Sequence, residues 1–170
     1  MNYQPSLETL KIAQTTCPEL GLGVHLVLTS GRPLLPAQKV PSLVKPDGTF
    51  FGYDAFIEHL DAINPDEALA EWRAQVELFV AATGHAPDHL DSHHHSSYFT
   101  PALFEGMLDL AQEYHCPIRN PFGAPPISFG NYLPDGSADK YENEISNLLS
   151  RYQPRAHQVF IVDFYDEGVT

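Results

Sequence analysis

Basic residues are scarce in this sequence, with 9 Lys and Arg against 22 Asp and Glu, and the formal net charge is −13. Nucleic-acid binding needs clustered cations that neutralise phosphates, and no such cluster occurs, so a nucleic-acid partner is excluded. The same shortage excludes a polybasic contact with a membrane surface. Long hydrophobic runs are also missing, because none approaches the roughly 20 residues that span a bilayer. We therefore expect no membrane partner.

Cysteine is scarce as well. Cys17 and Cys116 lie far apart and form no CxxC pattern, which excludes a disulfide framework and predicts free thiols in a reducing compartment. The first residues, MNYQP at 1–5, lack the basic and apolar regions of a secretory signal. A cytoplasmic location is the expectation.

What is present suffices for one packed domain: 170 residues, of which 43% are apolar and 11% aromatic. Residues 19–29 alternate in character, which predicts a strand. Leucine and valine occupy one face of that strand. The other face carries His25 among the small residues Gly21 and Gly23, which leaves room for a bound species.

Further elements alternate along the chain and predict an α/β fold with parallel strands and crossover helices. Pro- and Gly-rich loops are expected over 31–52 and 120–136. Helices are expected over 6–14 with a cap at Ser6, from Asn64 to Gly84, from Thr100 to Ala111, and over 139–152. Strands are expected over 88–95, 116–119 and 158–165.

Histidines concentrate in residues 88–95, DHLDSHHH. An extended backbone would place His89, Asp91, His93 and His95 on one face, at a spacing that suits a shared divalent cation with nitrogen ligands. Asp91 would either bind the cation or fix the tautomer of a ligating histidine. A solvated polar segment is the plainer alternative.

The remaining histidines give a weaker signal. A single histidine on a strand, such as His25, is also compatible with a hydrogen-bonded core residue, although its glycine-lined face favours a site. Others lack acidic or histidine partners at ligand spacing and are expected at the surface or at helix ends: His59, His85, His115 and His157.

Three segments carry a resemblance to a known family: GVHLVLTSGRPL at 23–34, PSLVKPDGTF at 41–50 and GHAPDHLDSHHH at 84–95. They resemble the YdjC-like carbohydrate deacetylases, a group that includes chitooligosaccharide deacetylases. The likeness extends over nearly the whole chain and implies a modified (β/α) barrel that hydrolyses N-acetyl groups on amino sugars with a bound divalent metal. It implies His25 and His93 as metal ligands.

The sequence departs from that family at two places. The family opens with a strand that ends in an Asn-Ala-Asp-Asp-Phe-Gly-like motif, which supplies a metal ligand and a general base, and it closes with a later His-Pro segment. Neither occurs here, so we expect residues 1–170 to form a single partial domain, an incomplete (β/α) barrel of the glycoside hydrolase/deacetylase type. No catalytic acid or base is assigned, and Asp91 is expected to orient a ligand histidine.

The expected function is therefore a metal-dependent carbohydrate deacetylase that acts on N-acetylated oligosaccharides, with activity impaired in this chain. Two imidazoles suit Zn, Mn or Fe, whereas the family is described with Mg, and the expected cofactor is a divalent metal ion, Mg or Zn. Arg119 either holds a sugar hydroxyl or acetyl oxygen or forms a surface salt bridge. Unpaired strand edges predict a homodimer. The alternatives are another barrel metallohydrolase and a non-catalytic metal- or sugar-binding domain.

Overall fold

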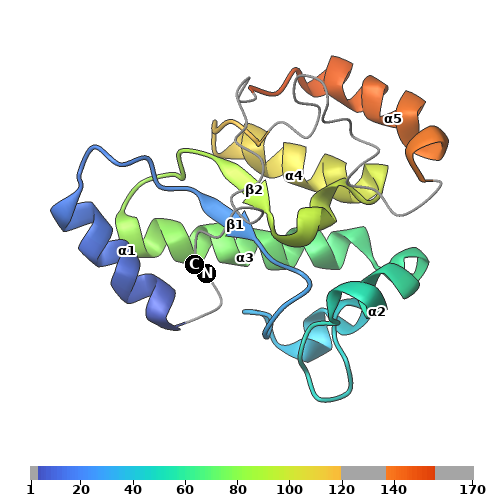
Figure 1. Cartoon of the computed structure of the whole chain (residues 1–170), viewed down its shortest axis with the longest axis horizontal. Coiled ribbons are helices and arrows are strands. Elements are labelled where there is room, and N and C mark those ends of the chain that lie inside the picture. Colours follow the sequence, from blue (N-terminus) through green and yellow to red (C-terminus); the bar gives the residue numbers. More distant parts are fainter. Residues whose placement is uncertain (1–3, 120–136, 156–170) are drawn as a thin grey trace, which may run out of the picture.

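The structure, a computed structural model, describes residues 4–119 and 137–155. Helices dominate this part of the chain, and short strands lie between them (Figure 1). The helices are α1 Gln4–Thr16, α2 Tyr53–Glu58, α3 Pro65–Thr83, α4 Pro101–Glu113 and α5 Ser137–Tyr152. The strands are β1 Val24–Leu26 and β2 Leu90–Ser92, and 3₁₀ helices are η1 Ala37–Lys39, η2 Pro41–Leu43, η3 Leu60–Ala62 and η4 His93–Tyr98.

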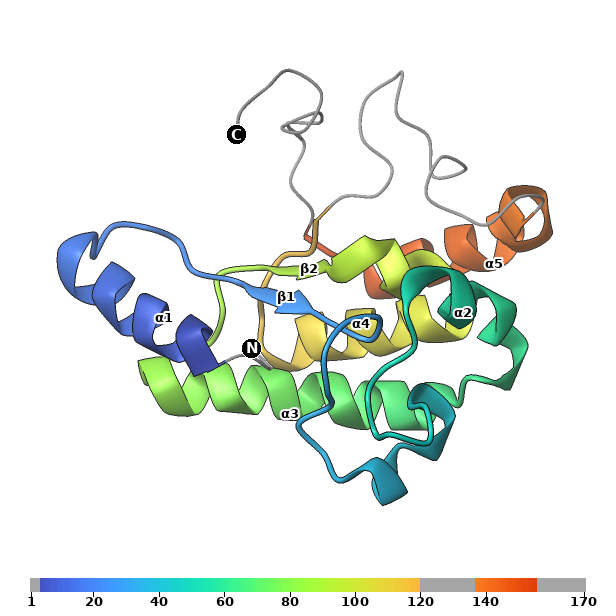
Figure 2. The same cartoon turned by 60° about the horizontal axis from the view of Figure 1, so that its bottom comes forward.

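The strands β1 and β2 pair in parallel, with Val24 opposite Leu90. Ile118 adds a parallel bridge on the other edge of β2, where the sequence predicts a short strand at 116–119. Helices α3 and α4 run along one face of this sheet, and α5 packs against α4 (Figure 2). The fold is therefore α/β with parallel strands, as expected.

Local side-chain chemistry sets the ends of the longer helices. Asn64 caps α3 by accepting a hydrogen bond from the amide of Asp66, and Thr100 caps α4 by accepting one from Leu103. Gly84 ends α3 in the left-handed conformation, with φ of 80°. These predicted boundaries are confirmed.

The core lies between the sheet and the helices. Trp72 and Phe79 from α3, Phe104 from α4 and Leu26 from β1 are fully buried. Cys116 is buried beside this core and Cys17 is exposed, and both thiols are free. Within the described residues, no helix is both long and apolar enough to cross a membrane.

Strand β1 is much shorter than the predicted strand over 19–29. Leu20 is 56% exposed instead of packed. At the other end, Gln75 of α3 accepts a hydrogen bond from the backbone amide of Val27 and donates one to its carbonyl. These bonds satisfy the backbone groups that a longer strand would have paired, so the sheet ends at Leu26.

Helix α1 begins earlier than predicted. It starts at Gln4, so Ser6 lies inside the helix and is not its cap. Pro5 falls in the first turn, where the absent amide removes no helical hydrogen bond. The prediction for 139–152 is close, because α5 covers Ser137–Tyr152. The predicted loop over 120–136 and strand over 158–165 lie outside the described residues.

The segment 31–52 is a structured loop that follows β1 in the chain and closes on itself. The amide of Phe50 donates to the carbonyl of Gly31 and closes the base of the loop. Two carboxylates of α3 hold its interior, because Glu71 accepts bonds from the amides of residues 34 and 35 and Glu67 accepts from Ser42. The loop is fixed to α3, and helix α2 starts directly after it.

Candidate functional site

The parallel register of the strands places His25 directly opposite Asp91. Nδ1 of His25 lies 2.6 Å from Oδ1 of Asp91. A carboxylate only accepts hydrogen bonds, so the contact places a proton on Nδ1. In the neutral ring, Nε2 then keeps a free lone pair, which is the form that binds a metal ion.

Asp91 also faces Arg119, whose Nη1 lies 3.6 Å from Oδ2. Burial by itself would raise the pKa of Asp91, but the hydrogen bond from His25 and the charges of His25 and Arg119 outweigh it, and the pKa is lowered. Asp91 is therefore a carboxylate held between a ring and a guanidinium.

The chain turns sharply immediately after β2. The predicted strand over 88–95 ends at Ser92, and His93 begins η4. His94 and His95 both take left-handed backbone angles, with φ of 51° and 59°, a conformation uncommon for residues other than glycine. His95 therefore does not share an extended face with His89 and Asp91, and that part of the expectation is wrong. Its ring stacks against Tyr98 instead.

The turn brings the ring of His93 to the ring of His25. Nε2 of His25 lies 3.2 Å from Nδ1 of His93, and the rings meet edge to face with centroids 5.3 Å apart. Burial, followed by the charges of His94 and His25, lowers the pKa of His93 to about 4. The ring is therefore neutral at pH 7 and able to offer a lone pair.

This pair fits a divalent metal ion. Two nitrogens at bond lengths of about 2.0–2.1 Å on a tetrahedral ion lie roughly 3.3 Å apart, close to the 3.2 Å between the two rings. No group of three or more His, Cys, Asp and Glu side chains arranged as metal ligands occurs in residues 4–119 and 137–155. Asp91 contacts the nitrogen of His25 that points away from His93, so the geometry favours an orienting role for it.

Gly23 does not clear space for a bound species. A Cβ at this position would lie 2.4 Å from Nε2 of His89, which directly precedes β2 as Gly23 directly precedes β1. The absent side chain therefore makes room for the His89 ring. A glycine opposite a large residue on an adjacent strand is the sequence signal that could have revealed this packing.

A scan of protein-family descriptions matches residues 2–167 to a family described as YdjC-like protein. The chain belongs to the YdjC-like family. The geometry around His25 and His93 is thus that of a YdjC-like chain, and the resemblance inferred from its motifs is confirmed.

Curated relatives carry deacetylase names. A carbohydrate deacetylase of Enterococcus faecalis is 40% identical over 116 residues, which is 67% of this chain and 43% of the relative. A chitooligosaccharide deacetylase of Yersinia enterocolitica is 31% identical over 153 residues, which is 90% of this chain and 51% of the relative. The YdjC-like chain thus spans about half the length of the curated relatives that it matches.

A solved structure has the same fold. It comes from Enterococcus faecalis and is named as a candidate cellobiose-phosphate cleavage protein. It is 32% identical, superposes with a TM-score of 0.72, and the match covers 96% of this chain and 56% of that one.

His94, the residue after His93, contacts Thr29 and Tyr53 in the YdjC-like chain. It is exposed, its Nδ1 lies 3.0 Å from the hydroxyl of the buried Thr29, and its ring meets Tyr53 edge to face. Neither Thr29 nor Tyr53 is predicted from the sequence to lie beside the site. No local pattern marks either residue, because the left-handed turn that brings His94 to them is itself unexpected.

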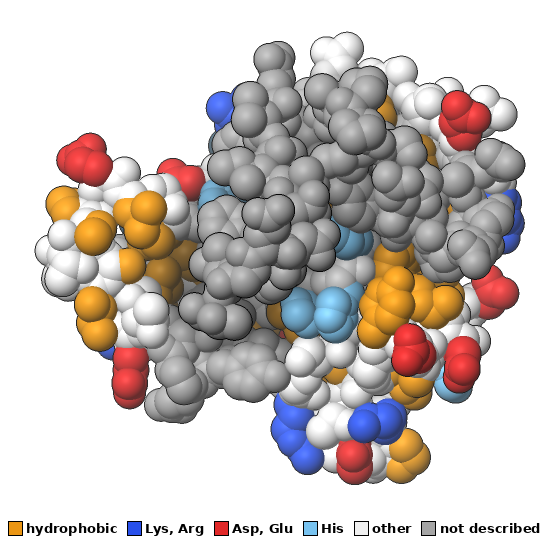
Figure 3. Space-filling model, in the orientation of Figure 1, with side chains coloured by type: hydrophobic (Ala, Val, Ile, Leu, Met, Phe, Trp, Pro, Cys, Tyr) orange, Lys and Arg blue, Asp and Glu red, His pale blue; other side chains and the backbone are white. Residues whose placement is uncertain are grey.

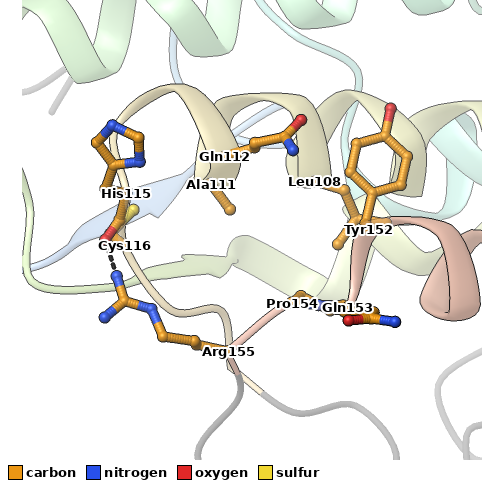
Figure 4. A pocket seen from close by; sticks show the side chains of 9 residues that line it. All are labelled: Leu108, Ala111, Gln112, His115, Cys116, Tyr152, Gln153, Pro154 and Arg155. Carbon is orange, nitrogen blue, oxygen red and sulfur yellow. Dashed lines mark hydrogen bonds between the residues drawn. The ribbon is translucent and has the colours of Figure 1, made fainter.

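The other histidines lie apart from the site. His59, His85 and His115 are exposed, as predicted, and His157 lies outside the described residues. A cavity of about 160 Å³ near His115 lies between the ends of α4 and α5, and Arg155 donates to the His115 carbonyl across it (Figure 4). Neither His25 nor His93 lines this cavity.

Proposed function

We propose that this chain carries the metal-binding part of a metal-dependent carbohydrate deacetylase, a hydrolase that removes acetyl groups from N-acetylated amino sugars. The observation that carries the proposal is the approach of His25 and His93 to 3.2 Å, with Asp91 behind His25. The deacetylase names of the relatives support the substrate class.

The residues of the chain would hold the ion through Nε2 of His25 and Nδ1 of His93. Asp91 keeps the proton on Nδ1 of His25, so the ligating nitrogen stays unprotonated. A divalent ion bound there would act as a Lewis acid toward the acetamide carbonyl. Nitrogen ligands favour Zn over Mg, and Mg stays in the proposal through the family resemblance.

Arg119 is proposed as a substrate-binding residue. Its side chain is 31% exposed and lies against Asp91. A guanidinium presents several N–H donors in one plane, which suits a sugar hydroxyl or the acetyl oxygen as well as a carboxylate. Arg119 would bind one of these oxygens of the sugar.

Closure of the parallel strands into a (β/α) barrel, with residues 1–170 as one partial domain, also belongs to this proposal. A cytoplasmic location is proposed because Cys17 and Cys116 are free thiols. A homodimer is proposed because, among the described strands, β1 pairs with β2 on one side only.

A second candidate function is a non-catalytic metal- or sugar-binding domain. This alternative is favoured because no third side chain joins His25 and His93 as a metal ligand among the described residues. Two neutral imidazoles bind a divalent ion less tightly than the same pair with a carboxylate, so we expect weak metal occupancy and slow turnover in this chain.

The two candidates are separated by measuring acetate release from N,N′-diacetylchitobiose with and without a chelator, alongside Zn²⁺ binding by titration calorimetry. We expect slow, chelator-sensitive release that His25→Ala and His93→Ala each abolish together with Zn²⁺ binding. His85→Ala is the matched control, because its ring contacts Phe79 and Gln14 instead of the site.

Metal binding that both site variants remove, without any acetate release, would favour the non-catalytic domain. Undiminished release by His93→Ala would show that the metal site is wrongly assigned.

A further inference from the structure

Tyr53 is an exposed aromatic residue beside the candidate metal site. It is 42% exposed, which is unusual for a large hydrophobic residue in this structure. Its ring centroid lies 5.3 Å from that of His94, and the ring centroids of His94 and His93 lie 3.9 Å apart. A continuous row of rings thus runs from His25 to Tyr53, and exposed histidines lie next to hydrophobic side chains on this face (Figure 3).

The Tyr53 ring is supported from below. It meets Phe99 edge to face at 6.0 Å, and Phe99 in turn packs on Phe56. Phe56 and Phe99 are both fully buried. A ring anchored on buried aromatic groups loses little conformational freedom when a ligand covers it, so the cost of binding is small.

The loop before Tyr53 fixes its place relative to the site. The bond from the Phe50 amide to the Gly31 carbonyl closes the loop, and after Gly52 the chain enters α2 with Tyr53 as its first residue. Glu71 holds the loop from α3. The position of the ring is therefore set by hydrogen bonds to Gly31, which follows β1 in the chain, and to Glu71 of α3.

We propose that Tyr53 is a stacking platform for a pyranose ring of the oligosaccharide, next to the sugar whose acetyl group lies at His25 and His93. This inference rests on the proposed function for the identity of the substrate. One intervening ring, that of His94, separates Tyr53 from His93, which leaves room for a neighbouring sugar.

The chemistry of the surface suits a sugar. The face of a pyranose presents C–H groups that pack on an aromatic face, while its hydroxyls need donors and acceptors at the edge. The hydroxyl of Tyr53 and the exposed ring of His94 supply such groups. Ile12 and Leu20 are more exposed, at 61% and 56%, but they are aliphatic and offer no ring face to a sugar.

The test uses the full 170-residue chain and a fluorescent variant. The sequence holds one tryptophan, Trp72, which is fully buried. In Tyr53→Trp, a change of emission on adding N,N′-diacetylchitobiose or cellobiose would therefore report on position 53. Both sugars share the pyranose faces, and only the first carries acetamido groups, so we expect both to change the emission, with and without a chelator.

Affinity measured by calorimetry completes the test. Tyr53→Ala should weaken the binding of both sugars about tenfold, the value of one aromatic packing interaction. Tyr53→Phe should keep most of the affinity because it keeps the ring, and Ile12→Ala is the control that should change nothing. In turnover, Tyr53→Ala should raise KM for the disaccharide while kcat stays close to its original value.

The proposal would be overturned if neither sugar changed the emission of Tyr53→Trp. It would also be overturned if the Tyr53→Ala and parent chains bound both sugars with equal affinity. The proposed function fails differently, through absent acetate release while both sugars still bind in a Tyr53-dependent manner.

Discussion

At the scale of single residues, Asp91 of β2 contacts the ring of His25 on β1 and so orients it. Replacing it with Asn keeps the shape but no longer forces the proton onto Nδ1 of His25. We expect Asp91→Asn to weaken Zn²⁺ binding about 10- to 100-fold, as is usual for residues that orient a metal ligand. Titration calorimetry measures this, with the exposed Asp61→Asn as the control. Equal affinity in the Asp91→Asn and parent chains would show that Asp91 does not orient His25.

The neutral rings of η4 make the chain sensitive to acid. Burial is the main cause that lowers the pKa of both His93 and His95 to about 4, from an ordinary value of 6.5. Both residues therefore bind protons more readily in the unfolded chain, and the free energy of unfolding should decrease as the pH falls from 6.5 to 4. Denaturant unfolding of the metal-free chain at several pH values measures this.

A matched variant isolates the contribution of one ring. His95→Gln should flatten the pH dependence over this window, while His85→Gln, at an exposed position, should leave it intact. A slope that is the same in both variants would contradict a half-buried, neutral His95.

At the scale of elements, the strands meet through a close contact between Gly23 and the His89 ring. Gly23→Ala would force that ring aside and should destabilise the fold by about 1–3 kcal/mol. Gly52→Ala is the matched control, because a Cβ there meets nothing within 4 Å. The double variant Gly23→Ala with His89→Ala should recover part of the loss, and its failure to do so would place the cause elsewhere.

Helix α3 and the loop over 31–52 depend on each other through Glu71. Glu71→Ala leaves the amides of Leu34 and Leu35 without their acceptors, and we expect a loss of about 1–3 kcal/mol. Hydrogen exchange at these amides should accelerate more than exchange in the middle of α3. Glu77→Ala, exposed on the same helix, is the control. Unchanged exchange at both amides would mean that other contacts hold the loop.

At this scale, the sequence separation between interacting residues decides which boundaries could be predicted. Caps such as Asn64 and Thr100 could be predicted because they act within one turn of the chain. The end of β1 could not, because it is set by Gln75, which lies 48 residues from Val27. The same distinction applies to the site.

The pairing of His25 with residues 88–95 followed from the motif and from the parallel strand order. The positions of His94 and His95, and with them the contact of His94 with Tyr53, depend on a left-handed turn that period-2 alternation does not signal. The approach of His25 to His93 could therefore be predicted from the sequence, and the side chains that surround the pair could not.

At the scale of the whole molecule, the net charge of −13 opposes self-association. If the chain dimerises through the free side of β1, salt should strengthen the dimer by screening this repulsion. Analytical ultracentrifugation at low and high NaCl concentration measures the effect. A monomer under both conditions would argue against the proposed homodimer.

The labelling rates of the two thiols would measure how often the fold opens. Cys17 lies exposed just after α1, whereas Cys116 is buried beside Ile118 at the edge of the sheet, and burial raises the pKa of its thiol. A thiol reagent should thus label Cys17 at once and Cys116 only when the sheet edge separates from α4. The interval between the two labelling events would report how often this half of the molecule opens under native conditions.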